Sequence, residues 1–175
     1  PTPETTESTV TDIVELSVQG VTAMSSDDRK LLDDITFDIR QGEIVGIAGV
    51  EGNGQAELTD ALMGIHEISS GSVMYKSDDI AEWSTKRRRE EGIGIIPADR
   101  HRQGLLLQSP WWENAMLGHQ TVTPFAKGPF IDRKGARERT NEVIERFDVK
   151  TPSADTAALA LSGGNQQKLI VGKEM

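Results

Sequence analysis

The 175-residue sequence has no cysteine, only 5% aromatic residues and no long apolar run. Without cysteine the chain has no disulfide framework, thiolate zinc site or cysteine nucleophile, and a reducing cytosol fits it best. The longest apolar run, at residues 44–50, is much shorter than the roughly 20 residues that cross a bilayer. Excess positive charge is also missing. The formal net charge of -9 argues against a duplex nucleic-acid binder, because neutralising phosphates needs a basic face.

One basic cluster, KRRR at residues 86–89, interrupts this acidic background. Two glutamates follow it directly, so a solvated helix face is the favoured interpretation and an anion site is the alternative. Hydrophobic residues make up 36% of the chain, which is enough to bury a core. Residues 1–10 are polar apart from Val10, and we predict a tail or linker there.

Apolar periodicity predicts several β-strands. IVELSVQGV (13–21) and DITFDI (34–39) alternate as half-buried strands do, and SGSVMYKSDDI (70–80) predicts a short hairpin strand. EIVGIAGV (43–50) is continuously apolar, which is typical of a strand buried on both faces. IGIIP (93–97) predicts a second buried strand.

Other segments have helical spacing. QAELTDALMGI (55–65) predicts a helix, and STKRRREEG (84–92) predicts another, with Ser84 as its cap. SPWWENAMLG (109–118) and DRKGARERTNEVIERFDV (132–149) also predict helices. Residues 105–160 are therefore predicted to form a helical insertion on an α/β core.

The stretch GVEGNGQA, residues 49–56, has the glycine spacing of a phosphate-binding loop between a strand and a helix. Gln55 and Ala56 stand where a lysine and a Ser or Thr are expected. Their loss weakens nucleotide binding by about 10²- to 10⁴-fold. Glu51 and Glu57 add negative charge that disfavours phosphate. A tight turn that binds no ligand is the alternative, and the loop alone does not decide between them.

A second stretch, LSGGNQQK at residues 161–168, also predicts an anion-binding helix start. Ser162 offers a hydroxyl at the helix cap, and Gly163 and Gly164 expose backbone amides. A run of side-chain amides that begins at Asn165 opens the helix.

In this order and context, LSGGNQQK closely resembles the signature motif of ATP-binding-cassette (ABC) ATPases, which is usually LSGGQ. The variant with Asn165 is similar to that of importers of simple sugars and nucleosides, in which two cassettes are fused and the second has a defective phosphate loop. GVEGNGQAEL (49–58) most resembles the nucleoside branch. IIPADRHRQGLLL (95–107) resembles the segment after the core strand of that second cassette. The resemblance runs from about residue 11 to the end of the chain.

The resemblance implies an α/β fold: a P-loop NTPase (ABC ATPase) core with an antiparallel β subdomain and a helical subdomain, incomplete at the C-terminus. Residues 11–175 would form a partial nucleotide-binding domain, with the helical subdomain at about 105–172. The sequence stops inside the signature helix, before the family's acidic strand end and switch histidine. We therefore expect a fragment without a general base or other catalytic residue, inactive alone. Three histidines are expected to be ordinary surface or loop residues: His66, His101 and His119.

Cassettes of this family meet head to tail. The resemblance implies that Ser162, Gly163, Gly164 and Asn165 meet ATP, bound with Mg²⁺ on the phosphate loop of an intact first cassette. Nucleotide binding at the chain's own loop is expected to be weak, and no metal site is expected in this chain. The residues that would contact nucleotide at that loop are Gly49, Gly52, Asn53, Gly54, Gln55 and Ala56.

A transmembrane permease is the second implied partner, which places the chain in the cytoplasm at the inner face of the cell membrane. The stretch that would line a groove for a permease helix is Leu105, Leu106, Leu107, Trp111 and Trp112. The alternative is that this stretch packs the insertion onto the core, and it is at least as well supported for Leu106 and for one of the tryptophans. Ala98 stands where the family usually has Gln or Glu, which puts metal sensing by this half in doubt.

Other functions stay open from sequence alone. A P-loop kinase is disfavoured because it would need the missing lysine and hydroxyl. A soluble ABC ATPase half outside transport and a non-catalytic interaction module both remain as alternatives. The choice between nucleoside and sugar rests on the form of the glycine loop.

Overall fold

The computed structural model describes residues 8–50 and 52–175, so the predictions for residues 1–7 and for Glu51 lie outside the described residues. The chain forms two compact units, one up to Arg88 and one from Arg89 onward. No helix of the described ranges is long and apolar enough to cross a membrane.

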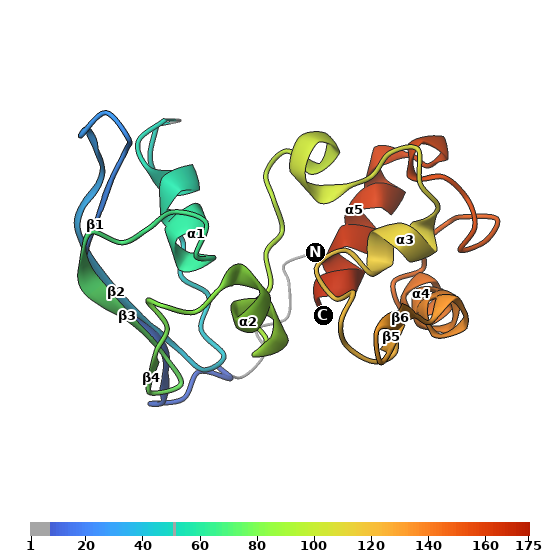
Figure 1. The fold of residues 1–175 in the computed structure, drawn as a ribbon, viewed down its shortest axis with the longest axis horizontal. Helices are drawn as coiled ribbons and strands as arrows, with labels where there is room; N and C mark the ends of the chain where they lie inside the picture. The colour runs from blue at the N-terminus through green and yellow to red at the C-terminus, as the bar shows by residue number, and fades with distance from the viewer. Residues whose placement is uncertain (1–7, 51) are drawn as a thin grey trace. The chain divides into compact units, whose positions relative to one another are not determined.

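The first unit contains a four-stranded antiparallel sheet in the order β2-β1-β3-β4 (Figure 1). Its strands are β1 (Val14–Met24), β2 (Lys30–Arg40), β3 (Ser70–Tyr75) and β4 (Asp78–Asp79). The strand predictions at 13–21, 34–39 and 70–80 are therefore confirmed. Val18 pairs with Phe37 of β2 and with Val73 of β3, and the register shifts between Val18 and Val21. This bulge keeps both valines on the buried face, although they are three positions apart in the sequence.

Helix α1 (Gln55–Leu62) follows the glycine loop, as predicted, and buries Leu58 and Ala61. The helix begins directly after Gly54, so the loop and the first turn of α1 form one continuous piece of backbone. The buried apolar side chains of this unit are Val18, Val21, Ala23, Leu32, Leu58, Ala61, Met63, Val73, Ile80 and Trp83.

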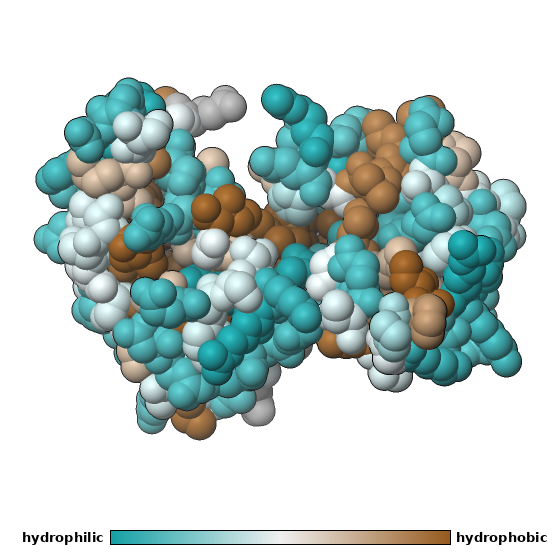
Figure 2. All heavy atoms as spheres, viewed as in Figure 1, coloured by the Kyte–Doolittle hydropathy of each residue, from teal (hydrophilic) through white to brown (hydrophobic). Residues whose placement is uncertain are grey.

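The two predicted buried strands, 43–50 and 93–97, are wrong for this structure. Neither segment forms a strand, and Ile44 is 97% exposed. A strand needs a neighbour for its amides and carbonyls, and none of the described strands pairs with either segment. Figure 2 shows brown, hydrophobic areas within a mostly hydrophilic surface. The exposed large apolar side chains of the two segments include Ile44, Val45, Ile47, Val50 and Ile96.

The interpretation of the KRRR cluster as a solvated helix face is wrong for Arg88. The cluster does lie on a helix, α2 (Thr85–Glu90), but Arg88 is only 1% exposed. Its guanidinium donates hydrogen bonds of 2.6–3.2 Å to five backbone carbonyls, including those of Leu62 and Ile80. These acceptors replace water around the charge. A Cβ on Gly64 would lie 2.9 Å from the Arg88 Nε, so this approach requires glycine.

Replacing Arg88 by alanine is expected to lower the free energy of unfolding by on the order of 3 kcal/mol, because several buried carbonyls lose their donor. The matched control is Arg87→Ala. Arg87 lies over the Trp83 ring at 4.0 Å on the exposed face, and its loss should cost about 0.5–1 kcal/mol. Urea unfolding of the chain measures both values, and equal losses would contradict the role assigned to Arg88.

The second unit is built on three helices, α3 (Trp111–Ala115), α4 (Arg133–Arg146) and α5 (Gly163–Glu174) (Figure 1). The helix predictions at 109–118 and 132–149 are confirmed, with α3 shorter than predicted. Smaller elements connect these helices: the π-helix η1 (Arg100–Gly104), the 3-10 helix η2 (Ala158–Ala160), and the short strands β5 (Ala126–Lys127) and β6 (Phe130–Ile131).

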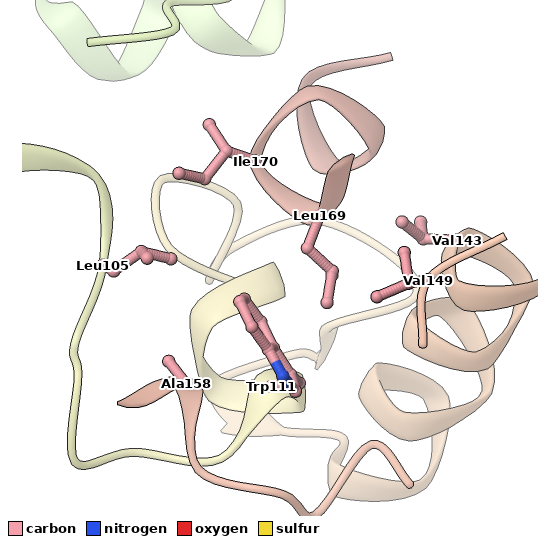
Figure 3. Packing of buried hydrophobic residues seen from close by; sticks show 7 residues of the cluster. All are labelled: Leu105, Trp111, Val143, Val149, Ala158, Leu169 and Ile170. Carbon is pink, nitrogen blue, oxygen red and sulfur yellow. The ribbon is translucent and has the colours of Figure 1, made fainter. Parts of the chain in front are cut away.

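Both tryptophans of α3 belong to the core of this unit. Trp111 is 1% exposed and Trp112 is 7% exposed, so both tryptophans pack, rather than one, and neither indole is free to line a docking groove. Leu105 is also buried, whereas Leu106 is 48% exposed, so the packing alternative is wrong for Leu106. Figure 3 shows the cluster around Trp111, which joins Leu105, Trp111, Val143, Val149, Ala158, Leu169 and Ile170.

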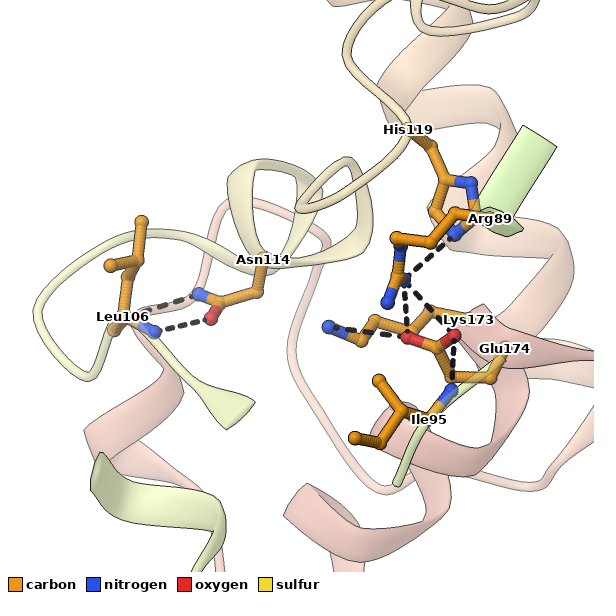
Figure 4. Close-up of polar contacts among 7 residues, drawn as sticks. All are labelled: Arg89, Ile95, Leu106, Asn114, His119, Lys173 and Glu174. Carbon is orange, nitrogen blue, oxygen red and sulfur yellow. Dashed lines mark hydrogen bonds and ion pairs between the residues drawn. The ribbon is translucent and has the colours of Figure 1, made fainter. Parts of the chain in front are cut away.

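The segment before α3 is held by the buried side chain of Asn114. Its amide oxygen accepts from the Leu106 N–H at 2.7 Å, and its nitrogen donates to the Leu106 carbonyl at 3.1 Å (Figure 4). The same nitrogen also lies within hydrogen-bond distance of the Ser109 and Pro110 carbonyls. The Asn114 side chain thus fixes the backbone of Leu106, whereas the side chain of Leu106 remains exposed.

A charged cluster lies at the end of α5. Arg89 donates to both carboxylate oxygens of Glu174, at 2.8 and 3.0 Å, and lies 3.3 Å from the His119 Nε2 (Figure 4). Lys173 is 3.7 Å from Glu174, and both of these side chains are over nine-tenths buried. Burial lowers the pKa of His119, and the positive charge of Arg89 lowers it further. His119 lies in a loop, which agrees with the prediction of a surface or loop histidine, but it is partly buried.

Because its pKa is lowered on folding, His119 should make the chain less stable in acid. Above the unfolded pKa of about 6.5 both states are neutral. As the pH falls below that value the unfolded state takes up a proton first, and stability declines by up to about 1.4 kcal/mol per pH unit. Urea midpoints between pH 7.5 and 5 should show this slope, and His119→Gln should reduce it. Parallel curves for the parent and the variant would contradict the assignment.

Candidate nucleotide site

The glycine loop in the first unit has the shape of a phosphate cradle. Gly52 and Gly54 adopt φ angles of 86° and 96°, a region that disfavours other residues. Gly54 is the N-cap of α1, and its carbonyl accepts the first helical hydrogen bond from Leu58. The amides of the first turn, which include Ala56, therefore point out of the helix, as in a nucleotide-binding loop. Ala56 and Asn53 are both exposed.

The side chain of Gln55 lies inside this cradle. Its amide nitrogen donates to the Val50 carbonyl at 3.2 Å, and a Cβ on Gly49 would overlap the same nitrogen. The uncharged Gln55 side chain therefore bonds to the loop itself, whereas a lysine at this position would supply a cation for the phosphates. Glu57, in the first turn of α1, places a carboxylate near the positive end of the helix, which it complements without any bound anion.

A cavity of about 560 Å³ lies beside the loop, within the first unit. Among the described residues that line it none is charged, and the polar ones are Asn53 and Gln55. No group of three or more His, Cys, Asp or Glu side chains that could hold a metal ion occurs among residues 8–50 and 52–175. The loop therefore fits Mg²⁺-ATP poorly: it has neither the lysine for the outer phosphates nor the hydroxyl for the metal.

The signature turn in the second unit has a more open helix start than the glycine loop. Helix α5 begins at Gly163, and its first hydrogen bond runs from the Gln166 N–H to the Ser162 carbonyl. The amides of Gly163, Gly164 and Asn165 precede that bond and have no partner within the helix. The first turn of α5 contains no acidic residue that could occupy the same position as an anion.

The cap of α5 differs from the prediction in one respect. Ser162 is the N-cap residue, but its hydroxyl bonds to no backbone amide. The hydroxyl oxygen instead accepts from the Asn165 side chain at 3.1 Å, and the Asn165 oxygen accepts from the Lys150 N–H at 2.9 Å. Because a serine hydroxyl both accepts and donates, its proton remains available for a ligand oxygen.

The two glycines of the turn have different surroundings. A Cβ on Gly164 would meet no atom within 4 Å, whereas one on Gly163 would lie 2.8 Å from the Arg100 Nη2. Gly164 is also exposed. A ligand can therefore approach the backbone at Gly164 freely, and at Gly163 it would meet the guanidinium of Arg100 as well.

Beneath the turn lies Gln166, which is 4% exposed. Its nitrogen donates to the carbonyls of Ala158 and Leu161, at 3.0 and 3.3 Å. Its oxygen accepts from Arg100 Nε at 3.2 Å and from His101 Nε2 at 3.0 Å. No sequence pattern predicts these contacts. Some 65 residues separate the partners, and no periodic pattern connects them.

Comparison with known proteins places this geometry in a family. The ABC transporter family model matches residues 32–175, which is most of the chain. The chain belongs to the ABC transporter family. The resemblance to ABC ATPases drawn from the signature motif is therefore confirmed at the level of the family. Members of this family bind ATP, normally with Mg²⁺.

Among curated ABC proteins, the guanosine import ATP-binding protein NupO of Bacillus subtilis is 38% identical over 160 residues, or 91% of this chain and 31% of NupO. The nucleoside import ATP-binding protein NupA of Lactococcus lactis is 39% identical over 141 residues, or 81% of this chain and 28% of NupA. The ribose import ATP-binding protein RbsA 1 of Streptomyces avermitilis is 34% identical over 158 residues, or 90% and 29%. The chain thus spans about a third or less of the length of these relatives.

Solved ABC structures confirm the fold class. The ADP conformation of MJ1267, an ATP-binding cassette of an ABC transporter, superposes with a TM-score of 0.71 at 19% identity and covers 93% of this chain and 64% of its own. A nucleotide-free ATP-binding cassette gives a TM-score of 0.72 at 19% identity, with the same coverage. The antiparallel sheet and the helices of this chain are therefore those of the P-loop ABC ATPase fold.

Calorimetric titration of Mg²⁺-ATP into the chain is expected to show no binding up to about 1 mM, which corresponds to about -4 kcal/mol. The double variant Gln55→Lys with Ala56→Ser restores a cation and a metal ligand to the loop, and should bind at least about tenfold more tightly. Gln55→Lys alone is the matched control and should gain less from Mg²⁺. Micromolar binding by the parent would mean that loop amides alone hold nucleotide.

Proposed function

We propose that the chain is the degenerate second cassette of an ABC importer. In this proposal its signature turn contacts ATP that is bound, with Mg²⁺, on the phosphate loop of an intact first cassette, either in the same polypeptide or in a dimer mate. The proposed nucleotide-binding domain comprises residues 11–175, with a helical subdomain at about 105–172 and a tail or linker at 1–10. The chain by itself hydrolyses no ATP.

The position of Gln55 is the observation that carries this proposal. A loop that binds phosphates must leave its interior free, and the Gln55 amide lies there, bonded to the Val50 carbonyl. The residues of ranges 8–50 and 52–175 that line the neighbouring cavity carry no charge. The glycine loop therefore supports the fold, and the chain contributes to catalysis through its other helix start.

The open backbone of the signature turn supports the second half of the proposal. Three amides and the Ser162 hydroxyl can donate to the terminal phosphate of ATP on the partner cassette. Donors held in place by a fold cost little reorganisation, and one such donor is worth about 10²- to 10³-fold in rate. When bound, Mg²⁺ neutralises the charge that develops on the phosphates.

The relatives support the choice of cargo and partner. Two of the most similar are a guanosine and a nucleoside import protein, at 38% and 39% identity, whereas the ribose import protein is 34% identical. A nucleoside importer is therefore proposed, and a sugar importer is the second candidate. In either case the chain acts with a transmembrane permease, in the cytoplasm at the inner face of the cell membrane.

The test is Gly164→Val in a protein that contains this chain and its intact partner cassette. Valine has space within the chain, because nothing lies within 4 Å of a Cβ at Gly164, but it blocks the approach of ATP. ATP hydrolysis should fall by about 10²-fold, with little change in melting temperature.

Glu138→Val on the exposed face of α4 adds the same side chain away from the signature turn and should leave hydrolysis unchanged. Parent-level hydrolysis by Gly164→Val would refute the proposed role of the turn and favour a non-catalytic interaction module. Uptake of labelled guanosine and labelled ribose by the same transporter separates the two candidate cargoes.

A further inference from the structure

The proposed function assigns no role to the segment between Ala98 and Leu105. It forms the π-helix η1, and Asp99 caps it by accepting from the amides of His101 and Arg102 at 3.1 Å. This cap leaves the side chains of η1 free to make other contacts. Those of Arg100 and His101 both reach the buried amide of Gln166 on α5.

Gln166 transmits this contact to the signature turn. Its nitrogen faces two carbonyls, so its oxygen must face η1, and the His101 Nε2 acts as a donor. Leu161, whose carbonyl accepts from Gln166 at 3.3 Å, is the residue directly before the N-cap Ser162. Hydrogen bonds to the oxygen of Gln166 therefore determine how the backbone enters α5.

Arg100 also touches the turn directly. Its Nη2 lies 2.8 Å from the position of a Cβ on Gly163, so the guanidinium covers the first residue of α5. A cation beside the positive end of a helix is electrostatically unfavourable. Among the described residues Arg100 forms no ion pair that would offset this cost. Stability of α5 therefore does not explain the placement of Arg100.

We propose that Arg100 is a positioning residue, which holds the signature turn in the orientation that meets ATP by bonding to Gln166 and packing on Gly163. The proposal rests on the proposed function, because it gives the turn a nucleotide to meet. It also explains why the two glycines differ: Gly163 makes room for Arg100, and Gly164 makes room for the ligand.

A double-mutant cycle tests the contact in the protein that contains both cassettes. Arg100→Ala removes the guanidinium, and Gly163→Ala displaces it with a methyl group. Each should lower kcat for ATP hydrolysis by about tenfold and leave the KM for ATP within about twofold, because ATP is bound mainly by the intact cassette. The double variant should be no slower than the slower single variant, since both changes break the same contact.

Two controls and one conservative variant test whether the effect depends on the contact between Arg100 and Gly163. Arg102→Ala removes a neighbouring arginine that is exposed and makes no side-chain hydrogen bond or ion pair within the described ranges, and it should leave kcat unchanged. Gly164→Ala should lower kcat by a factor that multiplies with that of Arg100→Ala, because the two act through different contacts. Arg100→Lys retains a donor for Gln166 and should recover kcat to within about threefold of the parent.

The possible failures are distinguishable. If Gly164→Val blocks hydrolysis while Arg100→Ala retains the parent kcat, the positioning role is overturned and the proposed function survives. Additive losses from Arg100→Ala and Gly163→Ala, or an equal loss from Arg102→Ala, also overturn the positioning role. If Gly164→Val and Gly163→Ala both leave hydrolysis intact, the proposed function itself fails. Melting temperatures of the variants separate unfolding from mispositioning, since an unfolded variant would not retain the parent KM.

Discussion

At three places in this chain a long polar side chain packs closely against the backbone of a glycine, and no side chain larger than hydrogen would fit there without displacing it. Gln55 lies over Gly49 in the phosphate loop, and Arg100 lies over Gly163 in the signature turn. Arg88 approaches Gly64 in the same way. A Cβ at any of these glycines would force the polar group away. The glycines that look like ligand-binding residues thus partly serve the chain's own side chains.

This constraint gives the two glycine-rich turns opposite properties. At the phosphate loop the amide of Gln55 turns back on the Val50 carbonyl, so the group that replaces the lysine closes the cradle. At the signature turn the neighbouring group packs on Gly163 only, and Gly164 remains open. Glycine at two helix starts of one chain therefore accommodates a side chain of the chain in one case and leaves the backbone open in the other.

Buried charge is handled by a related principle in both units. Arg88 is surrounded by backbone carbonyls, and Arg89 is paired with the carboxylate of Glu174. An unpaired buried cation would cost several kcal/mol, so each arginine has its acceptors supplied by the fold. Adjacent arginines in one short basic cluster thus belong to two different local structures, which a charge count along the sequence does not reveal.

The sequence by itself determined the family, the strands of the antiparallel sheet, the main helices and the two glycine-rich turns. These depend on local spacing and on motif letters, which can be read along the chain. Only the tertiary structure decided that residues 43–50 lack a paired strand, that Trp111 is core, and that Arg100 meets Gln166. Pairing, burial and side-chain contacts join residues far apart in sequence, and their energies depend on which partners the fold brings together.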